Sequence, residues 1–341
     1  MLDKRTLERV DAGRMHEVYD RWPQIAADAY EPRPGSDTVT YGDGITHIVF
    51  AGMGGSGAVG NLFSAVLSKT AVHVTVTKGY ELPKTVDKNT LVVATSVSGE
   101  TPETLAALEA ATRTDAQVVG VSSGGRLEQL CRSRGCGHIP IGQDHSPRAS
   151  FAGVVFSMLR VLEDVLPLQR GDVTEAIGRL QETGRAISSD NMDGGDNISR
   201  RIAERMAAVP LIYHPFGLRA AAIRFKNDLQ ENAKTHAIVE DVLEACHNGI
   251  VAWEAPSSVV GPVMITGSDD HPKTKERWQI LKEYFESANI EYVEIQSGEG
   301  GILAKLMGLA YVTGYASIYR AVMNGIDPSP VRSIDFVKKR L

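Results

Sequence analysis

The chain has 341 residues, of which 43% are hydrophobic and 23% charged, and its formal net charge is −6. This length suits two domains of ordinary size, each able to bury a core without a metal or disulfide staple. The mild negative charge, without a block of lysine and arginine, argues against nucleic-acid binding, and the charged N-terminal segment contains no apolar run typical of a signal peptide or a membrane span.

The first half of the chain predicts a helical arm followed by an α/β domain. Residues 3–30 have the pattern of an amphipathic helix, and a Pro/Gly/Asp-rich connector follows at 31–44. Short apolar runs then predict strands at 45–51, 72–77, 91–95, 118–122 and 138–141. The stretches between them predict helices at 57–68, 102–113 and 125–134. This alternation is typical of a parallel sheet covered by helices on both faces.

The second half repeats this layout without repeating the sequence. Helices are expected at 151–166 and 174–187, and a polar loop at 188–197. Further strands are expected at 211–214, 259–266 and 292–295, with helices at 217–235, 272–287 and 301–324 and a short one after residue 330. We therefore expect two α/β domains in tandem, residues 1–168 and 169–341.

The cysteines predict an intracellular protein. Cys246 is isolated in the sequence, and Cys131 and Cys136 have no second pair with which to complete a zinc site. An odd number of cysteines argues against a disulfide framework. We expect reduced thiols in a cytoplasmic protein, and whether Cys131 and Cys136 pair stays open.

A glycine-rich turn at residues 51–57 (AGMGGSG) follows the first strand and begins a helix. Glycines let the backbone approach an anion, and a helix N-terminus offers unpaired N–H groups to it. Gly52, Gly54 and Gly57 also match the dinucleotide-binding pattern G-x-G-x-x-G, which leaves a nucleotide-dependent oxidoreductase as one alternative. That alternative requires an acidic residue at the end of the next strand, where this chain has residues 78–80 (KGY), and the first acidic residue lies beyond the strand end.

A second loop, residues 96–104 (SVSGETPET), follows the third expected strand. Pro102 at the first helical position, preceded by Thr101, predicts the start of a helix. A simple helix cap explains Thr101 but leaves Ser96 and Ser98 without a role. Three hydroxyls around a glycine instead favour a loop that binds a phosphate group through O–H and N–H donors.

Together, the Gly-Gly-Ser turn and the S-x-S-G-x-T loop resemble the SIS (sugar isomerase) domain. The resemblance implies two SIS-like three-layer αβα domains with parallel sheets, an N-terminal helical arm and a C-terminal helix. The chain departs from the pattern at Glu100, where asparagine is common. We expect this side chain to point outward, because a carboxylate turned toward a bound phosphate would weaken its binding. SIS domains also occur in regulators, so a non-catalytic phosphosugar sensor is a second alternative.

Candidate catalytic residues lie in the second half, at 226–234 (KNDLQENAK) and 246–249 (CHNG). With residues 147–149 (PRA) and the terminal segment 327–338, they resemble the bifunctional phosphoglucose/phosphomannose isomerase family. This resemblance implies an aldose–ketose isomerase without metal or cofactor. Its substrate would be a small-molecule sugar phosphate: glucose 6-phosphate, mannose 6-phosphate or both, interconverted with fructose 6-phosphate through a cis-enediol(ate). The family also implies a homodimer, with neither nucleic acid nor membrane as partner.

The same resemblance assigns roles to individual residues. Glu231 would move the proton between C2 and C1, and Arg148 would stabilise the enediolate. His247 would open the sugar ring, assisted by Lys338 or by the adjacent Lys339. Two loops would bind the 6-phosphate through Gly54, Gly55, Ser56, Ser96, Ser98 and Thr101. We expect the site at the carboxyl ends of the strands of the first domain, covered by the second. His247 would come from the same subunit or from the partner.

Overall fold

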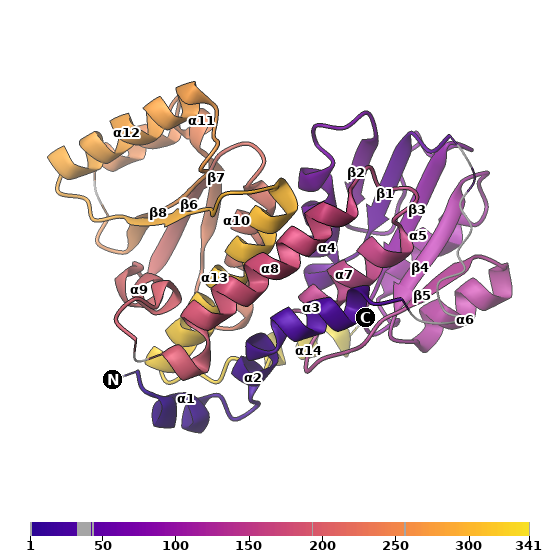
Figure 1. Cartoon of the computed structure of the whole chain (residues 1–341), viewed down its shortest axis with the longest axis horizontal. Helices are drawn as coiled ribbons and strands as arrows, with labels where there is room; N and C mark the ends of the chain where they lie inside the picture. Colours follow the sequence, from indigo (N-terminus) through magenta and orange to yellow (C-terminus); the bar gives the residue numbers. More distant parts are fainter. Residues whose placement is uncertain (1, 33–41, 43, 193, 256, 341) are drawn as a thin grey trace. The chain divides into compact units, whose positions relative to one another are not determined.

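The computed structural model describes residues 2–32, 42, 44–192, 194–255 and 257–340, so the connector expected at 31–44 lies mostly outside the described residues. The chain forms two compact units, coloured along the sequence in Figure 1. The N-terminal unit is Arg21–Gly178, and the C-terminal unit combines Met1–Asp20 with Arg179–Leu341. Compared with the expected domains 1–168 and 169–341, the first twenty residues group with the C-terminal half.

The N-terminal unit is built on a five-stranded parallel sheet in the order β2-β1-β3-β4-β5. Its strands are β1 (His47–Ala51), β2 (His73–Thr77), β3 (Thr90–Thr95), β4 (Gln117–Ser122) and β5 (Gly137–Pro140). Its helices are α3 (Trp22–Tyr30), α4 (Gly54–Val66), α5 (Pro102–Ala111), α6 (Gly125–Arg134) and α7 (Phe151–Val161). Every strand expected in this half occurs, each close to its expected bounds.

Helices cover both faces of this sheet. Successive residues of a strand point to opposite sides, so one strand can contact a helix on each face. Phe50 of β1 stacks on Phe63 of α4, with ring centroids 5.1 Å apart. The preceding residue, Val49, points the other way and packs with Ala111 of α5. The helices that follow the neighbouring strands β1 and β3 therefore leave toward opposite faces. In open α/β sheets, such a topological switch point is where ligands bind.

The C-terminal unit holds a four-stranded parallel sheet in the order β7-β6-β8-β9. Its strands are β6 (Val209–His214), β7 (Ile238–Asp241), β8 (Val260–Thr266) and β9 (Val293–Gln296). Its helices are α1 (Lys4–Val10), α2 (Met15–Asp20), α9 (Ile198–Arg205), α10 (Arg219–Glu231), α11 (Val242–Ala245), α12 (Pro272–Ser287), α13 (Ile302–Met323) and α14 (Arg332–Lys338). The helix α8 (Arg170–Ile187) crosses the boundary between the units. The sequence did not predict β7, a short edge strand that ends in two carboxylates, nor α9.

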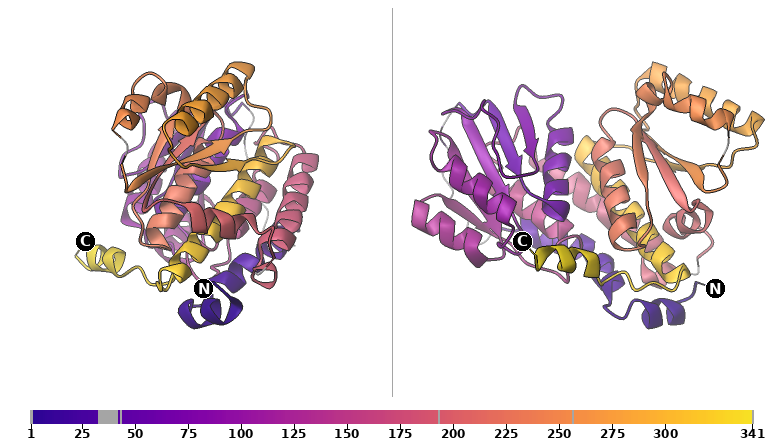
Figure 2. Two further views of the ribbon diagram at one scale, coloured as in Figure 1. Left: turned by 90° about the vertical axis from the view of Figure 1, so that its left-hand side faces the viewer. Right: turned by 180° about the vertical axis from the view of Figure 1, so that it is seen from behind.

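Both faces of the second sheet are also covered, as the two views in Figure 2 show. Tyr213, Met264, Trp278 and Phe285 belong to one cluster, through which α12 packs on the sheet. On the other face lies α13, which is long and apolar enough to span a membrane by length and composition alone. In this fold 89% of its most apolar 18-residue stretch is buried, so α13 is a core helix.

The N-terminal arm is not the single helix expected over residues 3–30, but three helices, α1 to α3. Asp11 ends α1, and its carboxylate accepts hydrogen bonds from the backbone N–H groups of Met15 (3.0 Å) and His16 (2.8 Å). It thereby caps α2. Arg14, at φ 57°, adopts the left-handed conformation between the two helices. A side-chain hydrogen bond to a later backbone group competes with the helical one, and here it divides the helix.

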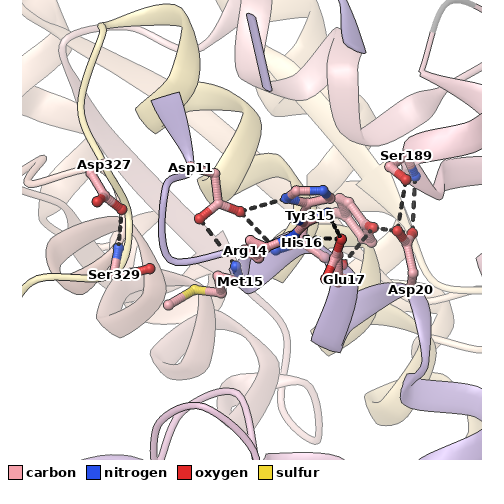
Figure 3. A network of polar contacts seen from close by, with 10 residues as sticks. All are labelled: Asp11, Arg14, Met15, His16, Glu17, Asp20, Ser189, Tyr315, Asp327 and Ser329. Carbon is pink, nitrogen blue, oxygen red and sulfur yellow. Dashed lines mark hydrogen bonds and ion pairs between the residues drawn. The ribbon is translucent and has the colours of Figure 1, made fainter. Parts of the chain in front are cut away.

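Hydrogen bonds, some buried and some half-buried, attach the first twenty residues to the rest of the C-terminal unit (Figure 3). The carboxylate of Asp20 accepts from the backbone N–H (3.0 Å) and the hydroxyl (2.7 Å) of Ser189 and from the hydroxyl of Tyr315 on α13. The hydroxyl of Tyr311, one turn earlier on α13, donates to the carbonyl of Tyr19 over 2.7 Å. Since a buried polar group without a partner is costly, these bonds explain why α1 and α2 group with a sheet far along the chain, whereas α3 belongs to the N-terminal unit.

Candidate functional site

The glycine-rich turn connects β1 to α4 at the carboxyl edge of the first sheet. Met53 occupies the N-cap position and makes no side-chain hydrogen bond to the helix, so the first amides of α4 are not capped by a side chain. A Cβ atom on Gly55 would lie 3.1 Å from the carbonyl oxygen of Pro147 and 3.3 Å from the backbone nitrogen of Arg148. Only glycine allows this approach, which places Arg148 beside the turn.

The hydroxyl loop joins β3 to α5 on the neighbouring strand. Thr101 occupies the N-cap of α5, as expected, but its hydroxyl does not cap the helix. It bonds instead to the hydroxyl of Ser96 over 2.9 Å. The hydroxyl of Ser56 accepts from the backbone N–H of Val97 over 3.4 Å and so connects the two loops. Ser98 is exposed, and its hydroxyl accepts weakly from the backbone N–H of Glu100.

A third loop, residues 122–126 (SSGGR), follows β4 and begins α6. No binding role was predicted for this loop, although serine and glycine between a strand and a helix are the same signal as in the other two loops. The hydroxyl and the backbone N–H of Ser123 both donate to the carbonyl of Val97, over 2.7 and 2.9 Å. Three adjacent strands, β1, β3 and β4, therefore end in interlocked Gly/Ser loops at one edge.

Arg148 lies in the bend that precedes α7, and the residue is only 3% exposed. The indole N–H of Trp22 donates to the carbonyl of Ala149 over 2.8 Å and holds this bend against α3. The backbone of the buried residue Arg148 thus lies beside the start of α4, next to the loops that carry the hydroxyls. Helix-start amides, hydroxyls and an arginine in one region form a donor set that suits a phosphate ester or another anion. The structure thus brings together all six predicted phosphate-binding residues and Arg148.

Glu231 is the last residue of α10, where it is half-buried. Arg224, Asp228 and Glu231 share one face of this helix, because they are spaced four and three residues apart. The Arg224 Nε and Asp228 Oδ2 atoms are 2.9 Å apart, and both side chains are buried. Burial opposes the charge on the guanidinium, but the negative charges of Asp228 and Glu231 raise the pKa of Arg224. The hydroxyl of Tyr19 accepts a long hydrogen bond from Arg224.

The end of α10 is fastened by two residues of the Glu-Asn-Ala-Lys run. The side-chain amide of Asn232 donates to the hydroxyl of Ser317 on α13 over 2.9 Å. The ammonium of Lys234 donates to the carbonyl of Glu231 over 2.7 Å and to the carbonyls of residues 327 and 328 over 3.3 and 3.2 Å. These two residues fix the backbone that carries Glu231, a role that the sequence analysis did not assign.

His247 and Glu231 lie at opposite ends of the strands of the second sheet: Glu231 at the amino ends and His247 at the carboxyl ends. Because α10 returns from the end of β6 to the start of the parallel strand β7, its last residue lies at the amino edge. His247 follows β7 and α11 at the carboxyl edge, where it is exposed and lines a cavity of about 520 Å³ with Lys273 and Arg277 of α12. Within one unit these two residues cannot act on the same bond. Lys338 is exposed near the end of α14.

The cysteines are free thiols. A side-chain hydrogen bond between Cys131 and Cys136 raises the pKa of the buried Cys131 and lowers that of Cys136. Over the part of the chain that the structure describes, no three His, Cys, Asp or Glu side chains lie close enough together to hold a metal ion.

Comparison with known families defines the class of protein first. The SIS domain profile matches residues 45–159, and the profile described as bacterial phospho-glucose isomerase C-terminal SIS domain matches residues 195–341. Each unit thus carries a SIS-type fold. A curated relative from Caldicellulosiruptor bescii, a bifunctional phosphoglucose/phosphomannose isomerase, is 30% identical over 339 residues, which cover 96% of this chain and 98% of the relative. The chain belongs to the bifunctional phosphoglucose/phosphomannose isomerase family.

A further relative carries a different enzyme name, and a solved structure shares the fold at low sequence identity. A D-glucosamine-6-phosphate 4-epimerase from Sulfolobus acidocaldarius is 29% identical over 328 residues, 96% of this chain and 97% of its own. A crystal structure of a hypothetical protein from Thermus thermophilus superimposes with a TM-score of 0.74 at 14% identity, and covers 98% of this chain and 92% of the other. At that identity the likeness shows a shared fold alone.

Proposed function

We propose that this protein is an aldose–ketose isomerase that interconverts glucose 6-phosphate, mannose 6-phosphate or both with fructose 6-phosphate. The observation that carries this proposal is the meeting of the Gly-Gly-Ser turn, the hydroxyl loop and Arg148 at the switch point of the first sheet. Family membership supports it, because the curated relative from Caldicellulosiruptor bescii is named for both epimers. Because these relatives are named as enzymes, they support an isomerase better than a non-catalytic sensor.

The 6-phosphate binds to the two loops in this proposal. The backbone of Gly54 and Gly55 and the hydroxyl of Ser56 present donors at the start of α4, where the helix dipole favours an anion. The hydroxyl loop adds Ser96, Ser98 and Thr101. The hydrogen bond between Ser96 and Thr101 leaves one of the two hydroxyls able to donate to the phosphate, and it orients both oxygens.

The proton transfer between C2 and C1 needs a carboxylate base and a cation near the developing oxyanion. Glu231 is the base in this proposal, and Lys234 and Asn232 hold its backbone in place. Arg148 stabilises the enediolate, since a guanidinium stays charged at all working pH values. His247, assisted by Lys338, donates and accepts the proton that opens the sugar ring.

We further propose that the protein is a homodimer in which His247 serves the site of the partner subunit. This is supported by the positions of Glu231 and His247 at opposite ends of the strands of one sheet. A mixture of Glu231→Gln and His247→Asn proteins, dissociated and reassociated, tests it. Shared sites would restore about a quarter of the wild-type activity, because half of the dimers would be hybrids with one intact site. No recovery in verified hybrids would place His247 in its own subunit's site.

The first test of the activity is a coupled assay with EDTA-treated protein and fructose 6-phosphate, in which glucose 6-phosphate and mannose 6-phosphate are measured separately. Turnover to either product supports the proposal, and turnover to both defines the bifunctional enzyme. Conversion of glucosamine 6-phosphate without turnover of fructose 6-phosphate would instead favour the chemistry named for the Sulfolobus relative. A rise in melting temperature with fructose 6-phosphate, but no turnover of any sugar phosphate, would indicate a sensor. The free thiols support a cytoplasmic location.

A further inference from the structure

The third Gly/Ser loop differs from the other two, because its helix N-terminus is already occupied from within the chain. The backbone N–H of Arg126, in the first turn of α6, donates to Glu100 Oε1 over 2.9 Å. The next N–H along, that of Leu127, donates to the carbonyl of Gly99 over 3.0 Å. Both acceptors belong to the hydroxyl loop. In contrast, the N-cap residues of α4 and α5, Met53 and Thr101, make no side-chain capping hydrogen bond.

Glycines make this contact between the loops possible. Gly99 has φ 72°, and a Cβ atom there would lie 1.9 Å from the carbonyl oxygen of Gly124. Gly125 has φ 73°, and a Cβ atom there would lie 2.6 Å from Glu100 Oε1. The carboxylate of Glu100 therefore lies directly over the first residue of α6. A side chain on either glycine would separate the loops.

We propose that Glu100 is a positioning residue for phosphate binding: by capping α6 it holds the Ser98–Glu100 turn in its binding conformation and keeps a second anion away from the α6 N-terminus. The proposal rests on the proposed function only in that a phosphate ester binds to the hydroxyl loop. A carboxylate in such a loop would ordinarily repel the substrate. Here the partial positive charge of the α6 N-terminus and the N–H of Arg126 offset that charge. Glu100 is exposed, as expected from the sequence, but it has a partner.

Three substitutions separate the length of the side chain from its charge. Glu100→Gln keeps the acceptor oxygen at the same distance without the charge. Glu100→Asp keeps the charge, but its side chain is one methylene too short to reach Arg126. Glu100→Ala removes both. If capping positions the loop, the Gln variant stays close to wild type, while the Asp and Ala variants raise KM for fructose 6-phosphate about tenfold.

The turnover number should stay within about twofold of wild type in all three variants. The phosphate is remote from C1 and C2, so weaker phosphate binding is lost equally from ground state and transition state and appears in KM alone. Glu103→Gln is the matched control, because Glu103 provides a nearby carboxylate in the first turn of α5, whereas the carboxylate that caps α6 belongs to Glu100. If removal of nearby charge were the cause, this control would change KM as well.

Inorganic phosphate serves as the anion probe. It should inhibit the wild type and Glu100→Gln competitively against fructose 6-phosphate. In Glu100→Ala the uncapped α6 N-terminus should add a non-competitive component at higher concentration. Competitive inhibition alone in Glu100→Ala would overturn the claim that Glu100 keeps a second anion away.

Thermal shifts with fructose 6-phosphate report binding without requiring turnover. A wild type that is neither active nor stabilised by the sugar phosphate would overturn the proposed function. A wild type that is stabilised, with the Asp and Ala variants stabilised equally, would overturn the role of Glu100 alone. So would an Asp variant that matches wild type beside a Gln variant that does not. If Glu100→Ala fails to fold, the Gln and Asp variants still decide between length and charge.

Discussion

Replacing Asp228 with leucine should destabilise the C-terminal unit far more than the loss of an ordinary helix ion pair. Its partner Arg224 is 3% exposed on its side chain, and the carboxylate itself is 1% exposed, with 2.9 Å between Nε and Oδ2. Removing one partner of a buried pair leaves an uncompensated charge, which costs about 3–5 kcal/mol. For a unit of this size that corresponds to a fall in melting temperature of roughly 6–20 °C.

The assay is urea unfolding followed by circular dichroism, with calorimetry for the melting temperature. The double variant Arg224→Met, Asp228→Leu removes both charges, so it should recover most of the stability that Asp228→Leu loses, since apolar replacements of a buried pair are often neutral. The exposed pair Arg132–Glu128 has the same i, i+4 spacing, and Arg132→Ala should change stability by less than about 1 kcal/mol. An Asp228→Leu protein as stable as that control would refute the burial argument, as would a double variant less stable than the single one.

Three further predictions concern the proposed active site and the N-terminal arm. Glu231→Gln should lower kcat by about 10²–10⁴-fold while a thermal shift with fructose 6-phosphate persists; unchanged kcat would remove Glu231 as the base. Combining Ser98→Ala with Thr101→Ala should chiefly raise KM for the sugar phosphate, and a normal KM would place the phosphate elsewhere. Burial raises the pKa of Asp11, but hydrogen bonds from His16 outweigh it and hold this pKa below its usual range. The ionised carboxylate therefore stabilises the fold at neutral pH, and this effect is lost as the pH falls through the lowered pKa. Asp11→Asn should therefore be less stable than wild type at pH 7, and the difference should shrink by pH 2 in urea titrations; an equal difference at both pH values would contradict this.

Local sequence patterns predict the alternation of strands and helices and the two loops that follow β1 and β3. These features depend on local chemistry: apolar runs of strand length, glycines that permit tight turns, and a proline that begins α5. The match is close for α6 and α12, whose bounds agree with the expected 125–134 and 272–287. The first sheet and the positions of its loops are therefore predictable from local sequence patterns alone.

Tertiary structure alone decided which distant residues meet. The backbone at Arg148 abuts Gly55 because α4 and α7 pack on one face of the sheet, and no spacing in the sequence encodes that approach. The same holds for Glu100, which looked like an unfavourable substitution until α6 supplied its partner. The edge strand β7 escaped prediction, whereas β5 and β9, edge strands of the same length, were expected. The pairing of β7 with β6 stabilises it more than its composition does.

The N-terminal arm shows the same division between local and long-range information. Its amphipathic pattern predicted helix correctly but not the break after α1, where the carboxylate of Asp11 competes for backbone N–H groups. Its attachment to α13 through Asp20 and Tyr315 depends on groups that are about 300 residues apart and find each other only in the folded chain. Local propensity chooses the elements, whereas burial and the need to satisfy every buried polar group choose their neighbours.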